Sequence, residues 1–127
     1  MLPVSTSTCS FNVTVTDSEN PVISCPANMS VSADAGQCGA VVNFSVTATD
    51  NCSANVVSTP ASGSFFAVGT TTVTSTATDA AGNTSTCSFD VTVTDGENPV
   101  ISCPANMSVS ADAGQCGAQW LTLSNCY

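Results

Sequence analysis

The sequence predicts an all-β protein, an immunoglobulin-like antiparallel β-sandwich arranged in tandem repeats. Three observations support this prediction. Apolar and polar residues alternate with a period of two along most of the chain. Turn-forming sequences such as SENP, ADAGQ and DAAGN separate the alternating runs. Finally, the stretch Thr8–Ala40 returns as Thr86–Ala118 with two substitutions, which indicates an array of one small unit.

The repeat divides the chain into three parts. Residues 18–95 form one complete repeat, residues 1–17 contain the last strand of a preceding repeat, and residues 96–127 begin the next one. The 127-residue chain is therefore out of register with its own repeat. We expect either a fragment of a longer array or a subunit that neighbouring copies complete.

The strands of the complete repeat follow from the alternation. Val, Thr and Phe, which suit half-buried pleated strands, dominate each run, and no run carries a helical stripe. Seven short strands at this spacing are typical of an immunoglobulin-like sandwich. We place six of them and leave a weak seventh unplaced in the middle; the six are Ile23–Ala33, Ala40–Thr49, Val56–Thr59, Gly63–Phe66, Thr70–Thr78 and Ser85–Thr94.

The charge composition excludes several classes of function. The chain has nine Asp or Glu residues and no Lys, Arg or His, so its net charge is −9. Without cations it has no surface for phosphates, and we expect no nucleic-acid partner. There is no His, Lys or Arg to serve as base, nucleophile or anion stabiliser, and paired carboxylates occur only in turns, so we expect no enzyme. No apolar run approaches the roughly 20 residues of a membrane span, so we expect no membrane insertion.

Eight cysteines in a chain of this length predict an extracellular protein. Small domains bury too little apolar surface to be comfortably stable and often recruit disulfides. Disulfides persist in oxidising compartments, so we expect a secreted or cell-surface location. The first residues, MLPVSTST, have no basic end and no apolar run, so we expect any secretion signal to lie outside this sequence.

Four motifs of the central unit resemble those of one known family. They are CPAN near its start, TDN after the second predicted strand, the run VGTTTVTSTATDAAGN, and the closing CSFDVTVTD. Together they resemble the hyalin repeat (HYR) domain. The resemblance implies an immunoglobulin-like fold, an extracellular setting, adhesive or architectural roles in tandem arrays, and no catalysis. It places the family's usual cysteine pair on Cys25 and Cys87, with Cys38 and Cys52 additional to that pattern.

The additional cysteines pose a problem of distance. The strand Ala40–Thr49 separates Cys38 from Cys52 and would span roughly 33 Å, whereas a disulfide needs Cα atoms within about 7 Å. We therefore predict that Cys38 pairs with the Cys52 counterpart of the following repeat, and Cys116 occupies the Cys38 position of the next copy. An intradomain Cys38–Cys52 bond remains the alternative if the strand boundaries are wrong or the strand folds back.

The chain ends suggest a second kind of crosslink. Cys9 has no Cys25-type partner before it, and Cys103 has no Cys87-type partner after it. The strand Cys9–Thr16 of one subunit could complete the sheet that begins at Cys103 of another, which would polymerise head to tail without closure. The weakness of this hypothesis is that the C-terminal piece lacks its middle strands.

Met1–Val4 and Gln119–Tyr127 do not fit the repeat. Both can be written as out-of-frame translations of codons for the repeat itself, so we hypothesise that insertions or deletions in the nucleotide sequence produced them. Cys126 would then be spurious. An authentic divergent terminus is the alternative.

Carboxylates and amides gather in three turns that this topology brings to one pole of the sandwich. Hard oxygen ligands converging at a junction suit Ca²⁺, which takes 6–8 of them. The alternative is that Asp and Asn simply favour turns. The proposed ligands are Asp17, Glu19, Asn20, Asp50, Asn51, Asp79 and Asn83, with Asp95, Glu97 and Asn98 repeating the linker part at the next junction.

Six N-x-Ser/Thr sequons are candidate glycosylation sites. The six Asn residues are Asn12, Asn28, Asn43, Asn51, Asn83 and Asn106. By the alternation, the side chains of Asn12, Asn28 and Asn43 should face outward.

These observations lead to a structural function. We expect a subunit or fragment of an extracellular fibre or surface stalk, in which copies pair head to tail and disulfides and Ca²⁺ reinforce the array. The alternative is an adhesive module of a secreted cell-surface protein that binds glycans or proteins.

Overall fold

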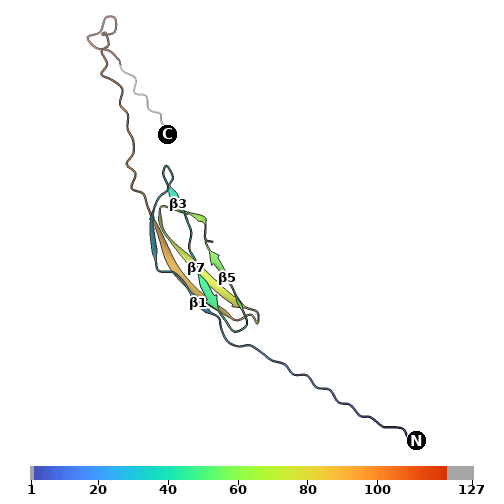
Figure 1. The fold of residues 1–127 in the computed structure, drawn as a ribbon. Helices are drawn as coiled ribbons and strands as arrows, with labels where there is room; N and C mark the ends of the chain where they lie inside the picture. Colours follow the sequence, from blue (N-terminus) through green and yellow to red (C-terminus); the bar gives the residue numbers. More distant parts are fainter. Residues whose placement is uncertain (1, 120–127) are drawn as a thin grey trace. The chain divides into compact units, whose positions relative to one another are not determined.

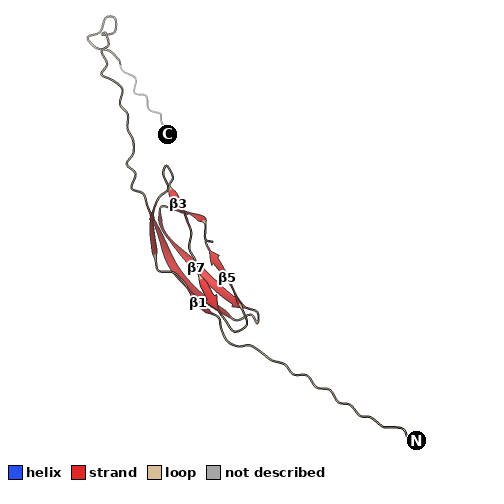
Figure 2. Cartoon of the chain, in the orientation of Figure 1, coloured by secondary structure: helices blue, strands red, loops and turns tan. Residues whose placement is uncertain are grey.

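The computed structural model describes residues 2–119, and all regular structure within them is β (Figure 2). No helix in this range is long and apolar enough to cross a membrane. The chain separates into two units, Met1–Glu97 and Asn98–Tyr127. All eight strands belong to the first unit: β1 (Val22–Ser24), β2 (Met29–Ser32), β3 (Gly39–Val42), β4 (Thr47–Thr49), β5 (Ala54–Thr59), β6 (Ser64–Ala67), β7 (Gly69–Asp79) and β8 (Thr84–Thr94).

The strands form the two layers of the predicted sandwich (Figure 1). One layer is a four-stranded sheet in the order β2-β8-β7-β5, built around the long β7–β8 hairpin. The facing layer consists of two short pairs, β1–β4 and β3–β6. All pairs are antiparallel except β2–β8, which is parallel, with Met29 opposite Val91 and Val31 opposite Val93.

The predicted strand Ile23–Ala33 is two strands, because Pro26 interrupts it. Proline has no N–H to give to a ladder, so pairing stops there. The chain crosses at this point from β1, which pairs with β4, to β2, which pairs with β8 in the other sheet. A single strand over this range was therefore wrong. The break lets one segment contribute to both layers.

The predicted strand Ala40–Thr49 is also divided, into β3 and β4. Between them Ser62 takes the place of a neighbouring strand: its Oγ accepts from Phe44 N and donates to Phe44 O, both at 2.8 Å. The Phe44 ring meets Phe89 edge to face, with ring centroids 5.0 Å apart. No further strand appears in the middle of the described repeat, so the eight strands arise from two splits rather than from the expected seventh.

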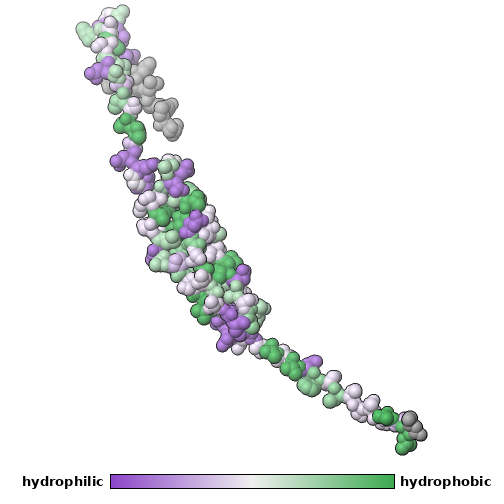
Figure 3. All heavy atoms as spheres, viewed as in Figure 1, coloured by the Kyte–Doolittle hydropathy of each residue, from purple (hydrophilic) through white to green (hydrophobic). Residues whose placement is uncertain are grey.

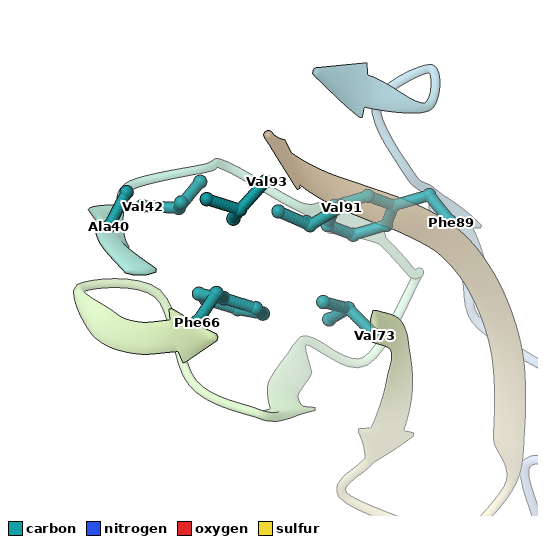
Figure 4. Close-up of a cluster of buried hydrophobic side chains, with 7 residues drawn as sticks. All are labelled: Ala40, Val42, Phe66, Val73, Phe89, Val91 and Val93. Atoms are coloured by element: carbon teal, nitrogen blue, oxygen red, sulfur yellow. The ribbon is translucent and has the colours of Figure 1, made fainter. Parts of the chain in front are cut away.

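The core lies between β7–β8 and the β3–β6 pair (Figure 4). Phe66 of β6 points toward Val73 of β7 and the Val91–Val93 face of β8. The packing around Gly39 leaves no room for a side chain, because a Cβ there would collide with Phe66 O and the Phe65 ring. The buried cluster contains Ala40, Val42, Phe66, Val73, Phe89, Val91 and Val93, each at most 4% exposed.

The sandwich has two ends that hold different turns. We name the end that holds Asp17, the turn Asp50–Cys52 and the turn Asp79–Asn83 the proximal pole, and the end that holds the turn Asp34–Cys38 and Thr94–Glu97 the distal pole. The β7–β8 ladder runs from Thr78↔Thr84 at the first to Gly69↔Val93 at the second. At about 3.3 Å per residue, β8 separates the poles by about 33 Å.

The same repeated sequence adopts two structures in this chain. In β8, Phe89, Val91 and Val93 are 4%, 0% and 1% exposed. Their counterparts Phe11, Val13 and Val15 are 83%, 77% and 91% exposed and lie in no strand. Residues 8–16, expected as the last strand of a preceding repeat, thus remain unpaired, because no β7-type neighbour precedes them in this chain.

The second unit, described up to residue 119, repeats one local feature of the first. Asp112 N donates to Gly117 O and Gln115 N to Asp112 O, as Asp34 N does to Gly39 O and Gln37 N to Asp34 O. Gly114 and Gly36 both have positive φ angles, 78° and 70°. The turn therefore forms without the sandwich, whereas the flanking strands do not. Residues 1 and 120–127, on which part of the frame hypothesis falls, lie outside the described residues.

We predict that the Phe→Ala substitution has a large effect on stability in β8 and almost none in its N-terminal copy. Phe89→Ala should cost about 3 to 5 kcal/mol of unfolding free energy because it leaves a cavity in the core. Phe11→Ala, in the same sequence context, should change it by less than about 0.5 kcal/mol because the ring is exposed. Denaturant unfolding curves of the two variants provide the comparison. Equal losses would mean that residues 8–16 pair with the sandwich.

Candidate functional site

The proximal pole holds the linker that leads into the sandwich. Asp17 makes a local turn there, its Oδ1 accepting from Glu19 N at 3.0 Å. The backbone oxygen of Asp17 accepts from Asn83 Nδ2 at 3.2 Å. The linker is therefore attached to the turn that joins β7 to β8. Hydrophilic surface gathers at this end of the sandwich, where the N-terminal segment joins it (Figure 3).

The β7–β8 turn is organised by one carboxylate. Asp79 is 7% exposed, and both of its oxygens accept from Asn83: Oδ1 from the backbone N and Oδ2 from Nδ2, each at 2.8 Å. Burial alone raises the pKa of Asp79, but the bonds from Asn83 and the backbone of Gly82 and Ala81 more than offset it, so the pKa lies below its ordinary value. Asn83 thus holds the linker through Nδ2, and both carboxylate oxygens of Asp79 accept hydrogen bonds from Asn83.

Two other acids meet in front of this turn. Oxygens of Asp17 and Asp50 and the Sγ of Cys52 all lie within 4.8 Å of one another. Asp50 Oδ2 accepts from Cys52 N at 2.7 Å, and Ser53, with a φ of 69°, turns the chain back after it. Asp17 Oδ2 is buried and has no hydrogen-bond partner. An unsatisfied buried carboxylate oxygen is costly unless a proton or a cation completes it.

A pocket continues from this cluster along the surface. It is lined by residues from both sides of the β1–β4 pair, namely Glu19, Asn20, Val22, Thr49, Asp50 and Asn51. Of the seven ligands predicted at this pole, Asp17 and Asp50 lie in the cluster, and Glu19, Asn20, Asp50 and Asn51 line the adjoining pocket. Asp79 and Asn83 lie behind them and position the linker.

Cys52 belongs to this cluster, which the sequence reasoning did not foresee. The pKa of its thiol is raised, mainly because the Asp17 carboxylate attracts the thiol proton, and further by desolvation and by the negative charges of Asp17, Asp50 and Asp79. The closeness of Asp50 and Cys52 in the sequence was the available signal. A thiol that keeps its proton is neither a good nucleophile nor a ligand for a hard cation.

The distal pole carries the linker that leaves the sandwich. Asp95 Oδ1 accepts from Glu97 N at 2.9 Å, which reproduces the Asp17–Glu19 turn. Glu97 Oε2 accepts from Gly36 N at 3.3 Å, so this linker contacts the turn that contains Cys38. Asn98 begins the second unit and is exposed. Asp95 and Glu97 thus repeat the hydrogen-bonded turn of Asp17 and Glu19.

The cysteines of the sandwich fall into one disulfide-bonded pair and two free thiols. Cys25 and Cys87 form a disulfide with Cα atoms 6.0 Å apart, which confirms the pair that the resemblance implied. It joins the crossover after β1 to β8. Cys38 and Cys52 are free, exposed and at opposite poles, so the structure contains no intradomain Cys38–Cys52 bond. Cys9, Cys103 and Cys116 are also free and exposed, and Cys126 lies outside the described residues.

The sequons differ in accessibility. Asn12, Asn43, Asn51 and Asn106 are exposed. Asn28 is exposed, but its Oδ1 accepts from Asp90 N at 2.9 Å. Asn83 is half-buried and uses its Nδ2 for Asp79 and Asp17, so a glycan there would disrupt the proximal turn.

We predict that Asp79 makes the fold sensitive to acid. Because its pKa is lowered on folding, its contribution to stability is present above the unfolded pKa of about 3.9 and is lost as pH falls through the folded value. The unfolding free energy should therefore fall below about pH 4, and Asp79→Asn should flatten this dependence. Asp112→Asn, outside the sandwich, is the control and should leave the dependence unchanged. A wild-type slope in Asp79→Asn would contradict the assignment.

Comparison with known proteins agrees with this architecture. The HYR domain family matches residues 16–93. The chain is 39% identical over 115 residues to Hyalin of Strongylocentrotus purpuratus, covering 84% of this chain and 10% of that protein. It is 40% identical over 91 residues to Sushi, von Willebrand factor type A, EGF and pentraxin domain-containing protein 1 of Rattus norvegicus, covering 67% of this chain and 2% of that protein. The chain thus spans a tenth or less of these relatives. It belongs to the HYR domain family, an adhesion-type extracellular repeat module.

Proposed function

We propose that this chain is a structural subunit, or a fragment, of an extracellular fibre or surface stalk built from head-to-tail sandwiches. The observation that carries the proposal is the attachment of the linker at both poles. Asn83 holds Asp17 where the linker enters, and Gly36 contacts Glu97 where it leaves. A linker bound at both ends favours a fixed orientation of successive units over free rotation. The Cys25–Cys87 disulfide reinforces each unit from within.

We further propose that Ca²⁺ stiffens the proximal junction. Asp17 and Asp50 each use one oxygen to hold a local turn, which leaves the buried Asp17 Oδ2 and the second Asp50 oxygen available. Glu19, Asn20 and Asn51 supply further oxygens around the adjoining pocket. These are the hard ligands that Ca²⁺ prefers. Because the chain has no Lys, Arg or His, a bound cation would also relieve the repulsion among the carboxylates.

An adhesive module that binds glycans or proteins is the second candidate. The feature that favours it is an apolar pair on the outer face of β3–β6. Val41 and Phe65 lie opposite each other in the ladder and are 54% and 55% exposed. This surface is small, so the fibre remains the leading proposal.

The fibre predicts a large native assembly. Native material should sediment as a species many times heavier than the 12.6 kDa chain. Denaturing mass measurement with and without reductant then identifies the linkage: a high mass that survives reduction indicates one long polypeptide, and a ladder that collapses indicates disulfide-joined subunits. A single species at the mass of one chain, in both native and denaturing conditions, would contradict the fibre.

The calcium site predicts a matched pair of responses. Ca²⁺ at 100 times its dissociation constant should raise the unfolding free energy by about 2.7 kcal/mol, seen as a higher melting temperature than in chelator. Asp17→Asn should abolish the rise. Asp95→Asn should keep the rise in unfolding free energy. This substitution changes the equivalent turn at the distal pole, where this chain provides no counterpart of Asp50. Cys52→Ser should also keep the rise, since sulfur is not a calcium ligand. An undiminished rise in Asp17→Asn, or stabilisation by Zn²⁺ that requires Cys52, would contradict the site.

A further inference from the structure

The two linkers give a relation between successive repeats. Because Thr86–Ala118 is the second copy of Thr8–Ala40, Asp95 and Glu97 stand in the next unit where Asp17 and Glu19 stand in this one. Their local bonds agree: Glu19 N donates to Asp17 Oδ1 at 3.0 Å, and Glu97 N donates to Asp95 Oδ1 at 2.9 Å. What contacts Asp17 in this unit therefore has a counterpart that contacts Asp95 in the following unit.

At the proximal pole, Cys52 lies beside Asp17. Its Sγ lies within 4.8 Å of carboxylate oxygens of Asp17 and Asp50, and its side chain is exposed. In an array, the Cys52 counterpart of the next unit consequently lies beside Asp95.

At the distal pole, the same linker contacts the turn that holds Cys38. Gly36 N donates to Glu97 Oε2, and Cys38 follows two residues later. Val68 N donates to Cys38 O at 3.0 Å, which fixes the Cys38 backbone beside the start of β7. The thiol itself is free and exposed.

Both thiols thus border one short linker, Asp95–Glu97. We propose that Cys38 of each repeat and the Cys52 counterpart of the following repeat form a disulfide across the junction. The inference rests on the head-to-tail array proposed above. Pairing within one repeat is excluded by the roughly 33 Å between the poles, against the roughly 7 Å that a disulfide allows between Cα atoms.

The bond forms by thiol–disulfide exchange with a small-molecule disulfide. The Cys38 thiolate attacks that disulfide, forms a mixed disulfide and releases one thiol. The thiolate of the next unit's Cys52 then attacks the Cys38 sulfur and releases the second thiol. Two protein thiols are oxidised to one disulfide, and one small disulfide is reduced to two thiols.

The test uses the full chain extended by one unit, with residues 18–95 inserted a second time after Asp95. Two variants of identical composition and mass are compared. The junction variant retains Cys38 of the first unit and Cys52 of the second, with Ser at the other two positions. The control variant retains Cys52 of the first unit and Cys38 of the second, which lie at the outer poles. In both, Ser replaces the remaining cysteines outside the Cys25–Cys87 pairs, namely Cys9, Cys103, Cys116 and Cys126.

Each variant is oxidised with glutathione disulfide at low protein concentration, denatured, alkylated with N-ethylmaleimide and weighed by mass spectrometry. The junction variant should carry no alkyl group and no glutathione, and the control should carry two modifications. Modification of both variants, closure of both, or linkage only between separate molecules would overturn the lock. X-ray scattering of the reduced chains tests the head-to-tail array separately from the disulfide. An extended, fixed two-unit shape in a chain whose junction cysteines do not form a disulfide would reject the proposed disulfide and still support the head-to-tail array.

A second measurement uses the unextended chain. Trypsin has no site because Lys and Arg are absent, so cleavage beside Asp and Glu provides the peptides. Cys38 and Cys52 should be found unlinked within a single molecule. A Cys38–Cys52 linkage within one repeat would overturn the proposal directly.

Discussion

The fold depends on the pairing of β8 with strands on both of its sides. β7 pairs with it along nearly all of its length, and β2 adds a parallel ladder on the other edge. This arrangement buries Phe89, Val91 and Val93 against the facing β3–β6 pair. The same residues in the N-terminal copy have no β7-type neighbour and remain in solvent. Hydrophobicity alone does not make this segment a strand; the hydrogen-bonding partner and the second layer are both required, since a lone strand leaves its backbone groups unpaired.

The two interruptions of the predicted strands allow one small repeat to form two layers. Pro26 passes the first segment from one sheet to the other, and the Cys25–Cys87 disulfide fixes that crossover to β8. Ser62 satisfies the backbone of Phe44, where the second segment leaves its ladder, and this lets Phe44 pack against Phe89. Each break therefore occurs where a specific side chain replaces the lost strand contact. The turns that these crossings align at the proximal pole are the ones that hold Asp17 and Asp50.

With no cationic side chain, the molecule stabilises its carboxylates with N–H donors. Asp79 receives bonds from Asn83 and from the turn backbone, and Asp17, Asp50 and Asp95 each accept a backbone N–H two residues later. In Asp17, Asp50 and Asp95 these bonds occupy one carboxylate oxygen and leave the other without a backbone donor. The uncompensated charge thus concentrates at the junction between units, which is where both the proposed cation and the proposed disulfide act.

The sequence by itself determined the period of the strands, the repeat boundaries, the Cys25–Cys87 pair by resemblance, and the separation of Cys38 from Cys52. It also determined the turn Asp34–Cys38, which recurs around Asp112 without a sandwich because its hydrogen bonds close between Asp34 and Gly39. Only the tertiary structure decided which copy of the repeated strand is buried, where two strands break, and that Cys52 meets Asp17. Local bonds need no partner from elsewhere in the chain, whereas a ladder, a core and a convergent cluster depend on residues dozens of positions apart.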